Sequence, residues 1–116
     1  MAWPKVNKEK AMAKPFHVRQ EAFNRWHADN PAIWTYFERF SFEALSHGHR
    51  KISHWLIINR IRWEVFVVTT GRDFKICNDF IAFYARLWRK KHPQHKTLFN
   101  IKRMHGEPFD TEGESQ

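Results

Sequence analysis

The sequence of 116 residues has little cysteine and little glycine, with one Cys and four isolated Gly residues. The single cysteine, Cys77, cannot form an internal disulfide or a multi-cysteine zinc site, which is typical of a protein in a reducing compartment. Because the glycines are scattered, no phosphate-binding loop is present, and no serine lies in the Gly-flanked elbow of a hydrolase.

Long apolar runs are also lacking. The longest, Phe80 to Ala85, falls far short of the roughly 18 residues of a membrane span. The basic N-terminus has no apolar stretch that would mark a secretory signal. A chain of this length fits one domain. We therefore expect a single cytoplasmic domain that does not enter a membrane.

Positive charge and aromatic rings are abundant instead. The chain carries 20 Lys and Arg against 12 Asp and Glu, a net charge of +8, and 16% of its residues are aromatic. Four of the 12 acids lie in the last ten residues, so residues 1–106 carry 20 cations against 8 acids, a net charge of +12. A basic, aromatic-rich body predicts a polyanionic partner, with nucleic acid the first choice.

The first half of the chain shows helical periodicity. Apolar spacing predicts helices over residues 16–28 and 31–47, the second beginning at Asn30-Pro31 and ending at Gly48. Ser53 can cap a third helix over residues 54–62. Residues 61–70 fit either its continuation or a strand: β-branched side chains favour the strand, continuity favours the helix, and we adopt the helix.

The second half predicts one strong helix, 79–92, capped by Asn78, with Asp79 in its first turn and basic residues in its last. Pro93 ends this helix and can start a short final one through Ile101. The acid-rich end predicts disorder. The predicted organisation is a loose basic arm over residues 1–15, a helical domain over 16–105 and a disordered acidic tail over 106–116.

The predicted fold class is mainly α, a single helical domain. The helices before and after Gly71 would form a helix-turn-helix-like pair, and one small β-hairpin would be present if residues 61–70 form a strand. In such folds the second helix enters the major groove of duplex DNA and phosphate contacts fix its position. The candidate nucleic-acid-binding cations are Arg60, Arg62, Arg72, Lys75, Arg86, Arg89 and Lys90. The alternative for this basic face is a solvated surface that keeps the protein soluble.

The aromatic residues allow two interpretations. Trp34, Trp55, Trp63 and Trp88 fall on apolar stripes and are predicted to lie in the core. Trp3 and Trp26, near the basic arm, are the better candidates for stacking on unpaired bases. Cys77 has no evident base beside it and is predicted to be a small core residue.

Two further patterns could carry chemistry. Six of the eight histidines form two clusters, His47, His49 and His54, and His92, His95 and His105. No cysteine or well-spaced carboxylate completes a ligand set, so we predict no metal or cofactor. Asp73-Phe74-Lys75, with Glu64 upstream, has the Asp-x-Lys spacing of metal-dependent nucleases. A solvated turn after Gly71 explains the same three residues more simply.

Four segments together resemble a family. Ile61-Arg62-Trp63-Glu64, Asp73-Phe74-Lys75-Ile76, Tyr84-Ala85-Arg86-Leu87 and His92-Pro93 resemble small, largely uncharacterised proteins carried by bacteriophages, prophages and bacteria. The resemblance covers about two thirds of the chain and implies a bacterial cytosolic setting, with no catalytic residues. It departs at Cys77 and Asp79, where the family pattern has Asn.

The sequence therefore predicts a non-catalytic nucleic-acid-binding protein, with duplex DNA the favoured partner, acting as a phage or prophage regulator or accessory factor. The alternative is a phage-type inhibitor that binds a host enzyme or defence complex through protein contacts. A small metal-dependent nuclease is the third hypothesis. The excess of aromatic residues could also cover a homodimer interface, which would suit palindromic sites.

Overall fold

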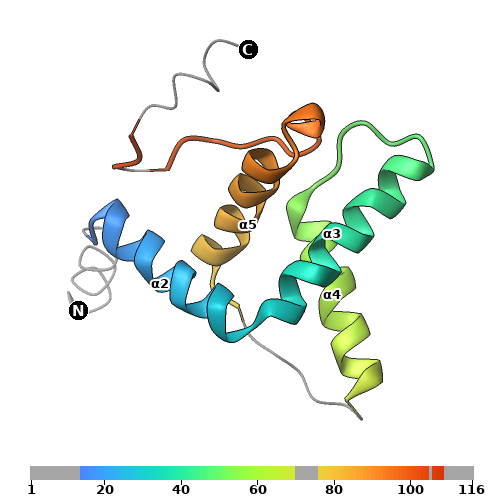
Figure 1. Ribbon diagram of the computed structural model, residues 1–116, viewed down its shortest axis with the longest axis horizontal. Coiled ribbons are helices and arrows are strands. Elements are labelled where there is room, and N and C mark those ends of the chain that lie inside the picture. The colour runs from blue at the N-terminus through green and yellow to red at the C-terminus, as the bar shows by residue number, and fades with distance from the viewer. Residues whose placement is uncertain (1–13, 70–75, 105, 109–116) are drawn as a thin grey trace, which may run out of the picture.

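The structure is a computed structural model that describes residues 14–69, 76–104 and 106–108. Within these ranges the chain forms four α-helices and one short 3-10 helix (Figure 1). They are α2 (Phe16–Asp29), α3 (Pro31–Ser46), α4 (His54–Val68), α5 (Asn78–Lys91) and η1 (Pro93–His95). The predicted mainly α class is confirmed. Residues 1–13 of the predicted basic arm, the end of the acidic tail and the Asp73-Phe74-Lys75 pattern lie outside the described residues.

Helix α5 is the centre of the packing. It contacts α2, α3, α4 and η1, and it buries Ile81, Phe83, Tyr84, Ala85 and Trp88. The Tyr84 ring contacts aromatic rings from two earlier helices: Phe23 of α2 at 4.9 Å, and Phe37 of α3 at 5.5 Å between centroids. The Tyr84 hydroxyl accepts a hydrogen bond from Trp26 Nε1, and burial raises the pKa of Tyr84 to about 12. A largely aromatic core thus holds α2 and α3 against α5.

The junction between α2 and α3 lies where the sequence placed it. Pro31 takes the first position of α3, where its missing N–H removes no hydrogen bond. Asn30 precedes it, but its side chain does not cap α3. Instead, Asn30 Nδ2 donates to the carbonyl of Trp26 and so closes α2.

Helix α4 is one continuous helix. The Ser53 hydroxyl accepts a hydrogen bond from the Trp55 N–H, as a capping serine does. The helix then runs without a break to Val68. The strand alternative for residues 61–68 is therefore wrong: continuity of the backbone hydrogen bonds outweighs the β-branched content. The connection to α5 spans Thr69 to Cys77, which is longer than the turn of about three to four residues in a helix-turn-helix.

Three local predictions need correction. Helix α5 begins at Asn78, so the capping position falls on Cys77, which is exposed rather than in the core and makes no side-chain capping bond. After Pro93 the chain forms only the single 3-10 turn η1, not a helix through Ile101. The buried pair Leu98 and Phe99 anchors this stretch in an extended conformation, through a bridge between Phe99 and Ile52.

The tryptophan prediction is half right. Trp34 and Trp88 are buried, whereas Trp55 and Trp63 on α4 expose 46% and 61% of their surface. Trp26, a candidate for base stacking, is only half-buried and bonds to Tyr84, so it belongs to the core. The exposed rings are thus those that the periodicity assigned to the interior.

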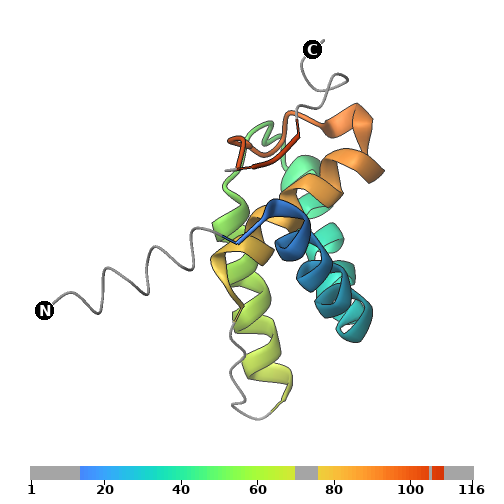
Figure 2. The ribbon, with the colours of Figure 1, turned by 90° about the vertical axis from the view of Figure 1, so that its left-hand side faces the viewer.

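The two ends of the domain are formed by different elements. The α3–α4 loop and η1 meet at one end, and the last turns of α4 project at the other (Figures 1 and 2). None of the helices in the described ranges has the length and apolar character needed to cross a bilayer.

Candidate nucleic-acid interface

The predicted cation Arg86 is held by the chain itself. Its guanidinium makes a bidentate contact with Glu107, Nε to Oε2 and Nη2 to Oε1, both at 2.8 Å. It also donates to the carbonyls of Ala82 and Lys102. The two charged side chains are only 15% and 19% exposed. In this arrangement Arg86 fastens the segment after η1 onto α5.

The Glu107 carboxylate has a pKa below its ordinary value. Burial on its own raises the pKa, but the hydrogen bonds from Arg86 and from the Met104 N–H, together with the charges of Arg86 and Arg103, outweigh it. Glu107 is therefore ionised at neutral pH, and the contact with Arg86 is a charge-assisted pair.

The two predicted arginines of α4 lie on its exposed surface. Arg60 pairs with Glu64 at 2.7 Å, and its guanidinium lies 4.2 Å from the centre of the Phe40 ring. Arg62 is exposed on the same helix. Arg72 and Lys75, which were predicted to add phosphate contacts, lie outside the described residues.

Arg89 and Lys90 lie in the last turn of α5, together with Lys91. Lys90 is exposed and Arg89 is half-buried. This turn leads directly into η1, at the end of the molecule opposite the last turns of α4 (Figure 1). The structure therefore separates the predicted cations into an α5 group and an α4 group.

The end of α3 sets the course of a basic loop beside the α5 group. Gly48 has φ of +91°, the left-handed conformation that glycine adopts without a Cβ penalty. Its N–H bonds to the carbonyl of Leu45, and the N–H of His49 bonds to that of Ala44, which together form a Schellman motif. The motif reverses the chain and carries Arg50 and Lys51 out of the helix into solvent.

This loop is tied to the segment that contains η1. The Ile52 N–H donates to the Leu98 carbonyl at 2.9 Å, and Lys51 Nζ donates to the Thr97 carbonyl at 3.5 Å. The indole of Trp88 donates to the His95 carbonyl at 3.0 Å, which fixes η1 on the end of α5. Two loops that lie more than 40 positions apart in the sequence are thereby held side by side.

A polar cleft of about 340 Å³ opens between the two loops. We call it the loop cleft; it is lined by Leu45, Gly48, His49, Arg50, Gln94, His95, Thr97 and Leu98. No carboxylate and no Trp, Tyr or Phe ring is among these residues. Lys51 and Lys96 flank it, and α5 adds Lys90 and Lys91 nearby in sequence. The Glu38 carboxylate of α3 is paired with His92 Nε2 at 2.7 Å.

The histidine clusters come together here in part. His49 and His95, one from each predicted cluster, both line the loop cleft. Within the described ranges, however, no group of three or more His, Cys, Asp or Glu side chains is arranged to hold a metal ion. His54 lies apart near Phe99, and burial, with a smaller effect of Arg86, lowers its pKa.

Sequence reasoning did not single out Arg50, Lys51 and Lys96, which lie in or beside the loop cleft. The available signal was composition: His47-Gly48-His49-Arg50-Lys51 and His92-Pro93-Gln94-His95-Lys96 are two similar runs rich in His and cations. Nothing in either run indicates that the other lies beside it.

Comparison of the chain with models of known protein families, with curated proteins and with solved structures finds no match.

Proposed function

We propose that the protein binds nucleic acid, with duplex DNA favoured, and that the loop cleft and the last turn of α5 contact the phosphate backbone. The observation that carries the proposal is the cleft itself: two basic loops tied together around a polar hollow without a carboxylate in its lining. Arg50, Lys51 and Lys96 add to the predicted cations Arg89 and Lys90. These five residues would form one cationic end on a chain of net charge +8.

The chemistry of the cleft suits phosphate rather than bases. Arginine and lysine side chains, threonine hydroxyls and backbone N–H groups are the usual donors to phosphate oxygens. Without a Trp, Tyr or Phe ring in its lining, the cleft offers unpaired bases little to stack on. Backbone contact of this kind favours an ordered duplex and gives affinity without sequence information. A role as a phage or prophage regulator or accessory factor fits this mode of binding.

A salt series tests the proposal. Binding of the purified protein to a labelled duplex, a single strand and a random RNA would be measured while the salt concentration is varied. Each phosphate contact contributes roughly 0.9 to the slope of log K against log salt for duplex DNA. Arg50→Gln combined with Lys96→Gln is expected to lower that slope by about two.

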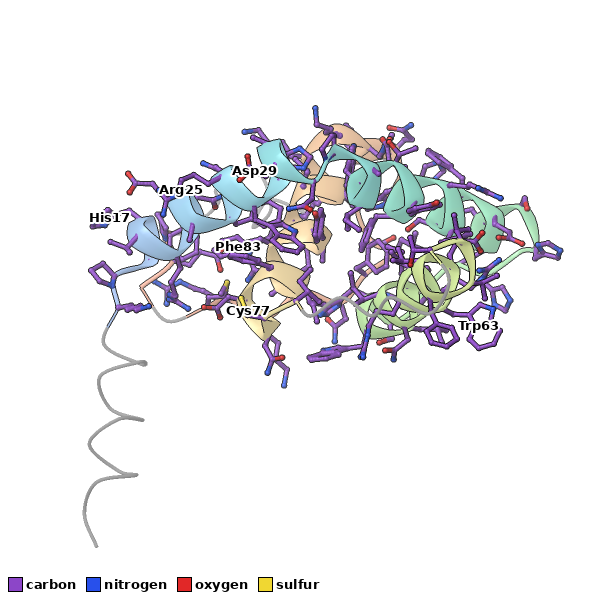
Figure 3. All side chains as sticks on the ribbon, turned by 90° about the horizontal axis from the view of Figure 1, so that it is seen from below. His17, Arg25, Asp29, Trp63, Cys77 and Phe83 are labelled. Carbon is purple, nitrogen blue, oxygen red and sulfur yellow. The ribbon has the colours of Figure 1, made fainter. Side chains whose placement is uncertain are left out.

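The matched control changes the same charge elsewhere. Lys14→Gln with Arg25→Gln removes two exposed cations at α2, where Arg25 lies on the outer side of the molecule (Figure 3). It is expected to change the slope far less than the cleft pair. An equal change in both pairs would remove the cleft as the contact. Absence of binding to all three nucleic acids at low salt would overturn the proposal and favour the host-protein inhibitor.

A further inference from the structure

The outer face of α4 is the least expected surface of the protein. Ile57, Ile58 and Ile61 point into the core, as a helix packed on one side requires. Six further apolar side chains of α4 each expose 46% to 62% of their surface: five lie on the opposite side, and Val68 lies in the last turn of the helix. We define the outer face by these residues: Trp55, Leu56, Trp63, Phe66, Val67 and Val68. A helix that is apolar all round is normally covered on all sides.

The aromatic rings on this face are exposed to solvent. The Trp63 and Phe66 rings stack on each other at 6.1 Å between centroids, and neither is buried. Figure 3 shows Trp63 at the edge of the molecule, on the side of α4 away from α3. The two rings form a platform that the rest of the described chain leaves uncovered.

The apolar area matches what an interface needs. With roughly 200 Å² for an aromatic side chain and roughly 100 Å² for Leu or Val, the six side chains expose about 500 Å². A standard interface buries about 800 Å² on each partner, and roughly 60% of it is apolar. The outer face alone therefore supplies the apolar share of one side of a specific protein contact.

The charges along one edge of this face are self-complementary. Arg60 and Glu64 lie one turn apart on the edge next to α3. A two-fold axis that pairs α4 antiparallel with a second α4 brings this edge against the same edge of the partner. Each Arg60 can then meet the Glu64 of the other copy. A groove of about 580 Å³ between α3 and α4, lined in part by Leu56 and Arg60, borders the edge and leaves room for a projecting side chain.

We propose that the outer face of α4 is the interface of a homodimer, in which two copies of this chain pair their α4 helices antiparallel about a two-fold axis. The self-complementary edge selects a second copy over an unrelated protein. Leu56, Val67 and Val68 have no ring to stack on a base, so half of the face would gain nothing from unpaired nucleic acid. The dimer does not depend on nucleic-acid binding, because none of the six outer-face residues lines the loop cleft.

Sedimentation velocity of the full chain across a dilution series tests the dimer. The expected result is a reversible species of about 28 kDa, twice the 14.1 kDa of the chain. Trp63→Glu should weaken the dimer by about 30-fold or more, the effect of removing a central aromatic anchor. Because Trp63 is exposed, the helical circular dichroism of this variant should be unchanged.

Val18→Glu is the matched control, since Val18 is an exposed apolar residue on α2. It introduces the same charge and should leave the dimer intact. A mass of one chain at every concentration would overturn the proposal. So would a Trp63→Ala variant that keeps the wild-type mass but loses affinity for single-stranded DNA, because the face would then stack on bases.

A charge exchange tests the two-fold arrangement. Arg60→Glu should weaken the dimer several-fold, because two carboxylates then face each other on each edge. Adding Glu64→Arg to the same chain should restore the dimer to within about threefold of wild type. Equal loss in the single and double variants would overturn the choice of a second copy as the occupant.

Discussion

Helices α4 and α5 are consecutive and nearly equal in length, 15 and 14 residues, yet the fold uses them differently. Helix α5 buries its aromatic side, as a helix at the centre of a domain does, and it carries cations in its last turn. Helix α4 buries three isoleucines, yet six of its other large apolar side chains expose 46% to 62% of their surface. The difference suggests that the fold alone accounts for the apolar residues of α5, whereas those of α4 serve both the fold and the proposed homodimer.

Two tryptophans, one from each helix, give the largest contrast. Trp88 of α5 is fully buried, and its indole donates to the His95 carbonyl. Trp88→Ala should lower the free energy of unfolding by about 3–5 kcal/mol, since it opens a cavity and removes one of the two hydrogen bonds that the His95 carbonyl accepts. Trp63→Ala should change it by less than about 0.5 kcal/mol when the protein is dilute enough to be monomeric.

Urea denaturation of the two variants at low protein concentration measures both values. Similar losses for Trp63→Ala and Trp88→Ala would show that α4 packs against the domain on both sides. The proposed division between the two helices would then be wrong.

The contact between Arg86 and Glu107 gives the next largest contrast between the two helices. Through this contact, α5 holds the C-terminal segment. Glu107→Gln should weaken the docking of residues 102–107 by about 2 kcal/mol at neutral pH, since it removes a largely buried charged partner. Hydrogen exchange at the Glu107 amide, which donates to the Met104 carbonyl, measures this docking.

The same contact predicts a pH dependence. The pKa of Glu107 is lower in the fold than its ordinary value of 4.5, so the carboxylate contributes stability above about pH 4.5. That contribution is lost as pH falls through the lowered pKa. The difference between wild type and Glu107→Gln should therefore shrink in acid. A difference that stays constant between pH 7 and pH 3 would contradict the charged pair.

The helix caps provide the smallest contrast. Ser53 caps α4 through its hydroxyl, whereas Cys77 at the same position of α5 makes no side-chain capping bond. Ser53→Ala should cost about 1 kcal/mol of stability, and Cys77→Ser should gain up to about 1 kcal/mol. Thermal unfolding of the two variants measures the shifts, which should have opposite signs. Shifts of the same sign would mean that side-chain capping does not determine the stability of these helix ends.

Local signals allowed much of the fold to be predicted. The Asn30-Pro31 restart, the Gly48 stop and the Ser53 cap act through nearby backbone groups, so the sequence placed these boundaries correctly. The exposure of Trp55 and Trp63 could not be predicted, because periodicity shows which residues share a helix face but not which face meets the core. On α4 both faces are apolar, and the packing of α3 and α5 decides between them.

The candidate interface was less predictable for a related reason. Arg86 lies on the predicted basic helix, but a partner 21 positions away, Glu107, holds its charge. The loop cleft depends on the backbone hydrogen bond between Ile52 and Leu98, which no local sequence pattern predicts. Net charge predicts a class of partner, and only the tertiary contacts suggest where such a partner would be bound.

The central claim is that nucleic acid and a second copy use different surfaces of the protein, the loop cleft and the outer face of α4. Amide chemical-shift mapping of the isotope-labelled protein with a short DNA duplex tests it most directly. The account predicts shifts in residues 47–51, 89–91 and 94–97, with the amides of Trp63, Phe66 and Val67 unchanged. Shifts confined to the outer face of α4, with the loop cleft unaffected, would contradict it.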